Sequence, residues 1–152
     1  MSLAFDVISA LRGKTLATAE SCTGGLIGSL LSSVSGASRV YKGGIISYCD
    51  EIKHRFLSVE DETLAVYGAV SGEVAVEMAK GARMGIDSDV AISVTGLAGP
   101  QGDDFGNPVG LVYIGYSDAG QTVYREYRFS GSRENIRQAA AEQALALILD
   151  MQ

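Results

Sequence analysis

The chain has 152 residues, 47% of them hydrophobic, and a formal net charge of −6. This balance predicts one folded domain whose core needs neither a disulfide nor a metal. The 12 lysine and arginine residues are dispersed along the chain, which argues against a nucleic-acid-binding surface.

The location of the protein follows from its cysteines and its apolar runs. There are two cysteines, Cys22 and Cys49, and the N-terminal segment lacks the pattern of a signal peptide. No apolar run reaches the roughly 20 residues that cross a bilayer. We therefore expect a cytoplasmic protein with reduced thiols and no membrane insertion.

The first half of the chain alternates helical and extended patterns. Apolar residues recur at helical spacing from Leu3 to Leu11 and again from Leu26, while the intervening run is β-prone. Ser58 is predicted to be the N-cap of a helix with an acidic first turn, which Gly68 ends. The predicted elements are a helix over 3–11, a strand over 15–21, a helix over 26–34, a strand over 40–49 and helices over 50–57 and 59–67.

The second half begins with a helix and then turns to strands. Ser71 starts a helix that runs to about Met84, and residues 90–94 form a buried strand that ends at Thr95-Gly96. After a glycine-rich loop over 97–108, two strands flank a turn at 118–120, the pattern of a β-hairpin. Ser132 is predicted to cap a final helix.

Helices alternate with strands early in the chain, and a hairpin comes late. This order predicts an α/β fold in which helices cover both faces of a mixed sheet, a three-layer α/β/α sandwich. We expect residues 1–152 to form a single domain.

The segment Glu20-Ser-Cys-Thr-Gly-Gly25 lies at a strand-to-helix turn. Free backbone N–H groups at such a turn favour an anion or oxyanion, and Ser21, Cys22 and Thr23 are three potential nucleophiles. An equally supported alternative is that Thr23 caps the helix and that Gly24-Gly25 merely permit the turn. Gly25-x-x-Gly28 nearly completes a dinucleotide fingerprint, but Thr23 stands where its first glycine belongs.

Histidine and metal chemistry have little support in this sequence. His54 is the only histidine, and its position beside Lys53 and Arg55 predicts a solvated side chain. One histidine and two distant cysteines cannot build a usual zinc site, and no carboxylate spacing suggests Mg²⁺. We expect no metal and no cofactor. A hydroxyl activated by lysine or tyrosine remains, and Ser38, Tyr48 and Lys53 flank the second strand closely enough to be such a group.

Two further segments have the chemistry of ligand sites. Thr95-Gly96 ends a buried strand at the edge where open α/β sheets bind ligands, although a plain turn explains it too. Arg133 and Arg137 lie one helical turn apart and could together hold a phosphate or carboxylate; a solvated helix face is the ordinary alternative.

Six segments in the same order resemble the CinA C-terminal family from about Lys14 to the last helix. They are Thr18-Ala-Glu-Ser-Cys-Thr-Gly-Gly25, Gly43-Gly-Ile-Ile-Ser-Tyr48, Gly68-Ala-Val-Ser71, Thr95-Gly-Leu-Ala-Gly-Pro100, Pro108-Val-Gly110 and Phe129-Ser-Gly131.

The resemblance implies an enzyme of pyridine nucleotide salvage. The best characterised members hydrolyse the carboxamide of nicotinamide mononucleotide to nicotinic acid mononucleotide and ammonia. Longer members add an N-terminal molybdopterin-binding-like domain associated with pyrophosphatase activity, and we expect neither here. The competence and DNA-damage associations of the family name find no support in an acidic surface.

The resemblance also implies roles for particular residues. Ser38 corresponds to the nucleophile, Tyr48 and Lys53 to its partners, and Ser21 to the serine of the first segment. Residues 35–38 read Ser-Gly-Ala-Ser where the family has two adjacent serines, so Ala37 replaces one; this is harmless if Ser21 attacks instead.

The remaining implied roles concern binding. Thr95 and Arg133 match ligand-side positions, and Arg137 is expected to assist Arg133 on the substrate phosphate. The N–H groups of Gly24-Gly25 or Thr95-Gly96 would stabilise the oxyanion.

Two other functions stay open at this point. One is a catalytically silent nucleotide-binding or protein-interaction module of the same fold, and the other is a nucleotide-binding regulator or oxidoreductase. Family members form homo-oligomers, and we expect the same here. The hairpin's four tyrosines provide either an aromatic contact surface or core packing; they are Tyr113, Tyr116, Tyr124 and Tyr127.

Overall fold

The computed structural model describes residues 2–152 and contains a five-stranded mixed sheet. The strands lie in the order β2-β1-β3-β4-β5. Strand β1 pairs in parallel with both β2 and β3, whereas β4 pairs antiparallel with β3 and with β5. The bounds are β1 Leu16–Glu20, β2 Tyr41–Ile46, β3 Val90–Gly96, β4 Leu111–Ser117 and β5 Thr122–Arg128.

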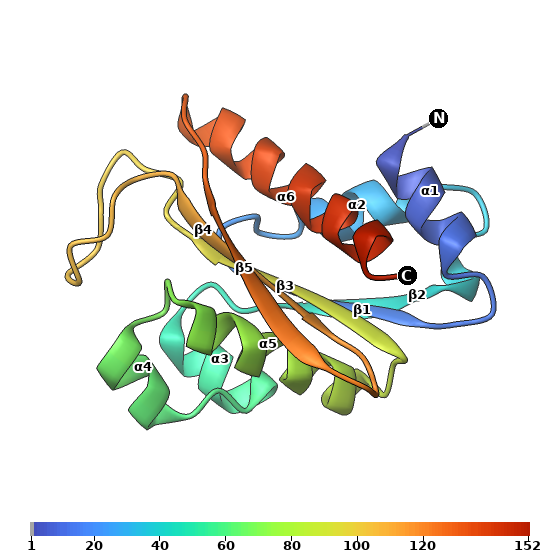
Figure 1. The fold of residues 1–152 in the computed structure, drawn as a ribbon, viewed down its shortest axis with the longest axis horizontal. Helices are drawn as coiled ribbons and strands as arrows, with labels where there is room; N and C mark the ends of the chain where they lie inside the picture. Colours follow the sequence, from blue (N-terminus) through green and yellow to red (C-terminus); the bar gives the residue numbers. More distant parts are fainter. Residues whose placement is uncertain (1) are drawn as a thin grey trace.

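Helices cover both faces of the sheet, which confirms the three-layer α/β/α prediction (Figure 1). On one face lie α1 Leu3–Ala10, α2 Leu26–Ser32 and α6 Arg133–Asp150; on the other lie α3 Asp50–Leu57, α4 Asp61–Tyr67 and α5 Gly72–Ile86. A short 3₁₀ turn, Ala37–Arg39, precedes β2. No helix in residues 2–152 is long and apolar enough to span a membrane.

The sheet separates two hydrophobic cores. Ile92 and Val94 of β3 pack with α1, α2 and α6, whereas Ala91, which directly precedes Ile92, packs with α5. Successive side chains of a strand point to opposite faces, so a strand buried on both faces is apolar almost throughout. This is why residues 90–94 were predicted to be buried without a polar face.

The helix caps agree with the sequence prediction except at Ser58 and at Thr23, whose hydroxyl donates to Glu20 while Gly25 is the N-cap of α2. Ser71 and Ser132 cap α5 and α6 by accepting hydrogen bonds from the N–H groups three residues later. Ser58 was predicted to be an N-cap, but it ends α3 in the left-handed conformation, and Glu60 is the N-cap of α4. The correction has a packing reason, because the tight turn at Ser58 buries Val59 completely.

The tyrosines of the hairpin mostly pack against the protein itself. Tyr116 is 1% exposed, and Tyr113 and Tyr127 are half-buried. Tyr124 is the most exposed of the four, at 46%, and its ring tilts against that of Tyr113. Of the two uses considered for these residues, the structure favours core packing over an aromatic contact surface.

Candidate active site

The carboxyl ends of the three parallel strands meet at one edge of the sheet, beside the loop that joins β3 to β4 (Figure 1). A cavity of about 610 Å³ opens there, within the size range of small-molecule sites. Its lining includes Ser21 after β1, Tyr48 and Lys53 after β2, Thr95 at the end of β3, and Arg133 from α6. Chain topology thus brings together residues from four separate segments.

Ser21 and Lys53 form the most chemically suggestive contact in the cavity. Lys53 Nζ lies 2.9 Å from Ser21 Oγ and donates a second hydrogen bond to the carbonyl oxygen of Ser47 at 2.7 Å. Lys53 is 2% exposed, and Ser21 is buried but reaches the cavity. An amine in such contact with a hydroxyl is a suitable general base for it.

The surroundings of Lys53 favour its neutral form. Burial lowers the pKa of Lys53, and the nearby charge of Asp50 offsets part of this effect. A neutral amine can direct one N–H to Ser47 and its lone pair to the Ser21 hydroxyl. The Ser47 carbonyl therefore orients the Lys53 amine.

Ser47 is itself fixed to the end of β1. Its N–H and its hydroxyl both donate to the carbonyl oxygen of Glu20, at 2.7 and 3.2 Å. Because Ser21 directly follows Glu20, Ser21 and the Ser47 carbonyl that Lys53 contacts are anchored to the same point of the sheet.

The other two candidates beside Ser21 are less suited to attack. Burial raises the pKa of the Cys22 thiol to about 11, so the thiolate is scarce at neutral pH. Thr23 is fully buried, and its hydroxyl donates to Glu20 Oε1 at 2.7 Å. Of the three, only Ser21 contacts the Lys53 amine.

The structure separates Ser38 from the residues expected to activate it. Ser38 lies in the turn before β2, whereas Tyr48 and Lys53 follow that strand. Six strand residues rise roughly 20 Å, so Ser38 sits at the opposite end of the sheet, on another surface hollow. Tyr48 does reach the cavity, where its hydroxyl accepts a hydrogen bond from Arg133 Nη2 at 2.8 Å.

The glycine-rich turn is occupied by a side chain that the sequence analysis did not single out. Glu20 is 2% exposed, and its carboxylate accepts hydrogen bonds from the N–H groups of Gly25, Ile27 and Gly28. The N–H of Gly24 donates to the Ser21 carbonyl. These donors are thus engaged within the turn, which argues against the dinucleotide reading and against an oxyanion site at Gly24-Gly25.

The signal for Glu20 was present in the sequence. A glutamate at the last position of a strand, directly before a helix start, is well placed to accept the helix's first N–H groups.

The two arginines of α6 turn to different partners. Arg133 donates to the Gly99 carbonyl and to the Tyr48 hydroxyl at the mouth of the cavity. Arg137 donates to the carbonyl oxygens of Cys22 and Thr23 and does not line the cavity. The structure therefore places Arg133 in the lining of the cavity and Arg137 against the turn that follows Ser21.

The end of β3 forms one wall of the cavity. The Thr95 hydroxyl donates to the Ala69 carbonyl at 2.8 Å, and the side chain is fully buried. Beyond it, Asp103 accepts hydrogen bonds from the N–H groups of Phe105 and Asn107, which organises the loop. The acidic residues Asp50 and Asp104 are also part of the cavity lining.

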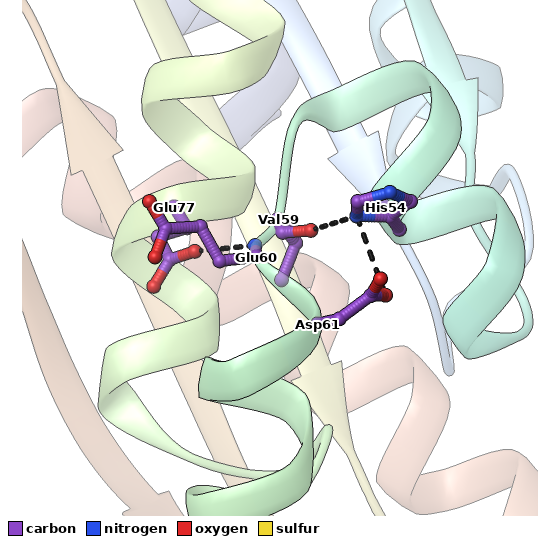
Figure 2. Close-up of polar contacts among 5 residues, drawn as sticks. All are labelled: His54, Val59, Glu60, Asp61 and Glu77. Atoms are coloured by element: carbon purple, nitrogen blue, oxygen red, sulfur yellow. Dashed lines mark hydrogen bonds and ion pairs between the residues drawn. The ribbon is translucent and has the colours of Figure 1, made fainter.

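His54 lies outside the cavity, between α3 and α4 (Figure 2). Its Nδ1 is 2.8 Å from the carbonyl oxygen of Val59 and 3.4 Å from Asp61 Oδ1, and about half of the side chain is exposed. Nearby, the Glu60 N–H donates to Glu77 of α5. The histidine thus serves the packing of helices. Residues 2–152 contain no cluster of three metal-ligating side chains.

Known proteins share both the sequence and the fold. A putative competence-damage inducible protein of Moorella thermoacetica is 47% identical over 141 residues, which cover 93% of this chain and 34% of that protein. A CinA-like protein of Syntrophomonas wolfei is 48% identical over 136 residues, or 90% of this chain and 33% of that protein. The chain thus spans about a third of the length of these curated relatives.

Solved structures agree over nearly the whole chain. A CinA superfamily protein of Escherichia coli superposes with a TM-score of 0.96 at 36% identity, covering 99% of this chain and 88% of that one. A competence/damage inducible protein of Agrobacterium tumefaciens gives a TM-score of 0.92 at 37% identity, covering 98% and 93%. Residues 2–152 match the family described as the CinA C-terminal domain, and the chain belongs to that family.

Proposed function

We propose that this chain is an amidohydrolase that removes ammonia from the carboxamide of nicotinamide mononucleotide, with Ser21 as nucleophile and Lys53 as base. The observation that carries the proposal is the 2.9 Å contact between Ser21 Oγ and the buried Lys53 Nζ in a substrate-sized cavity. The family resemblance suggests the substrate. The geometry favours Ser21 over Ser38, which lies at the far end of β2.

The reaction proceeds in two halves. Lys53 takes the proton of Ser21 Oγ as that oxygen attacks the carboxamide carbon, and then gives a proton to the departing nitrogen as the C–N bond breaks. Ammonia leaves. Water, deprotonated by Lys53, next attacks the acyl carbon, and Ser21 regains its proton as the acid is released.

Strand register supports Gly96 as an oxyanion donor. The Leu97 N–H donates to Leu111 of β4. Successive N–H groups of a strand point to opposite sides, so the Gly96 N–H points away from β4, toward the end of β1 where Ser21 lies. A carbonyl oxygen bound there would be held beside the nucleophile.

The cavity's charges suit a cationic ring with an anionic tail. Its lining includes the acidic residues Asp50 and Asp104 and the aromatic residues Tyr48 and Phe105, and such residue types favour a pyridinium cation. Arg133 at the mouth is the residue proposed to meet the phosphate.

Ammonia release from nicotinamide mononucleotide tests the proposal. Wild type should release ammonia, and Ser21→Ala should lower kcat about 10³-fold or more, as expected when a nucleophile is removed. The matched control is Ser38→Ala, which should retain wild-type turnover. Loss of activity in Ser38→Ala but not in Ser21→Ala would reverse the assignment of the nucleophile. An inactive wild type would contradict the proposed enzyme and favour the catalytically silent binding module.

A further inference from the structure

The turn that carries Ser21 is held from behind by a side chain of the last helix. Arg137 Nε donates to the Cys22 carbonyl at 3.0 Å, and its Nη2 donates to the Thr23 carbonyl at 2.9 Å. These residues are 115 and 114 positions away in the chain. Because the guanidinium is planar and rigid, two bonds to consecutive carbonyls set the orientation of that segment as well as its position.

Glu20 binds the hydrogen-bond donors of the same turn. Its carboxylate accepts hydrogen bonds from the Thr23 hydroxyl and from three N–H groups at the start of α2. The turn therefore has its carbonyls bound by a cation and its N–H groups bound by an anion. A turn gripped in both ways has little freedom to reorient.

We infer that Arg137 is a positioning residue: it holds the Cys22-Thr23 backbone so that Ser21 Oγ stays in contact with Lys53, and it does not bind the substrate. The activity part of this inference rests on the proposed function. The arginine donates to main-chain carbonyls and lies outside the cavity lining, which sets it apart from Arg133.

The helix should survive the loss of this guanidinium. Ile136, Ala140 and Leu147 are at most 1% exposed and anchor α6 to the core. Ser132 and Asn135 form a capping box at its start. Replacing Arg137 should therefore loosen the turn while α6 stays in place.

Cys22 offers a readout of the turn that does not depend on catalysis. Cys22 is 6% exposed, whereas Cys49 is exposed, so labelling by a maleimide in a Cys49→Ser background reports on Cys22. The charge of Arg137 lowers the pKa of Cys22. Loss of this charge alone would raise the pKa of Cys22 and slow its labelling. Any acceleration of labelling therefore reports an opening of the turn.

The test compares Arg137→Met with Arg125→Met, in which an arginine of a surface ion pair is lost. We expect Cys22 labelling to accelerate about tenfold or more in Arg137→Met and kcat to fall about 10²-fold, as for a small misplacement of reacting groups. KM should stay within about twofold. Arg137→Lys should show a smaller acceleration of labelling and a smaller fall in kcat than Arg137→Met, since its ammonium group can still donate to a carbonyl. Arg125→Met should match wild type.

Unchanged labelling and unchanged kcat in Arg137→Met would overturn the inference. A raised KM with wild-type kcat would also overturn it, because it would show that Arg137 binds substrate. If wild type releases no ammonia, the proposed function fails, and the labelling rates alone then decide whether Arg137 holds the turn.

Discussion

The burial of a single side chain, that of Lys53, is what suits it to act as a base. Lys53 forms no ion pair among residues 2–152, and its burial lowers its pKa. A lysine with a lowered pKa is neutral, and thus basic, over a wider range of pH. The rate should therefore rise with pH as Lys53 loses its proton and level off once the amine is neutral.

The pH dependence of kcat/KM checks this, because it reports ionisation in the free enzyme. We expect the rising limb to lie below the ordinary pKa of lysine. Asp50 raises the pKa of Lys53, so Asp50→Asn should move the limb to lower pH. Lys53→Met should abolish turnover, whereas Lys80→Met, at an exposed position of α5, should not. A limb that stays in place in Asp50→Asn contradicts the role of Lys53.

The contact between helices α3 and α5 sets the position of Lys53. A Cβ at Gly81 of α5 would overlap the carbonyl oxygen of Leu57, the last residue of α3, whereas a Cβ at Gly85 meets nothing within 4 Å. Gly81→Ala should therefore push α3 outward, destabilise the fold by about 1–3 kcal/mol and lower turnover by moving Lys53 from Ser21.

Gly85→Ala is the matched control on the same helix. It should stabilise the protein by up to about 1 kcal/mol, since alanine is the better helix former, and should leave turnover unchanged. Urea unfolding and ammonia release measure the two effects. If Gly81→Ala behaves like Gly85→Ala, the close approach of the two helices is not what holds Lys53.

The same elements show what the sequence could and could not predict. The periodicity of apolar residues predicted the helices and strands, and the order of these elements predicted the mixed sheet. Both periodicity and order can be read along the linear sequence. Lys53 and Tyr48 were predicted because they lie close to the end of the second strand and because the family resemblance implies roles for them. The contact of Lys53 with Ser21 spans 32 positions and the partners of Arg137 span 115; such pairings depend on how strands and helices pack, which spacing does not record.

One sheet forms a wall of both hydrophobic cores, so a substitution that destabilises either core should destabilise the whole domain. Met78 of α5 and Leu147 of α6 are both fully buried, on opposite faces of the sheet. Each →Ala variant should lose about 2–5 kcal/mol of unfolding free energy. Met84→Ala, on the same helix as Met78 but 64% exposed, should change it by less than about 0.5 kcal/mol.

The shape of the unfolding curve carries the rest of the argument. Strand β3 contributes Ile92 to one core and Ala91 to the other, so neither core can melt without removing a wall of its neighbour. Fluorescence from the tyrosines and circular dichroism should follow a single urea transition in wild type and in both variants. Two separated transitions in Met78→Ala or Leu147→Ala would show that the layers unfold independently. The cavity, which draws Lys53 from one layer and Arg133 from the other, would then depend on their docking.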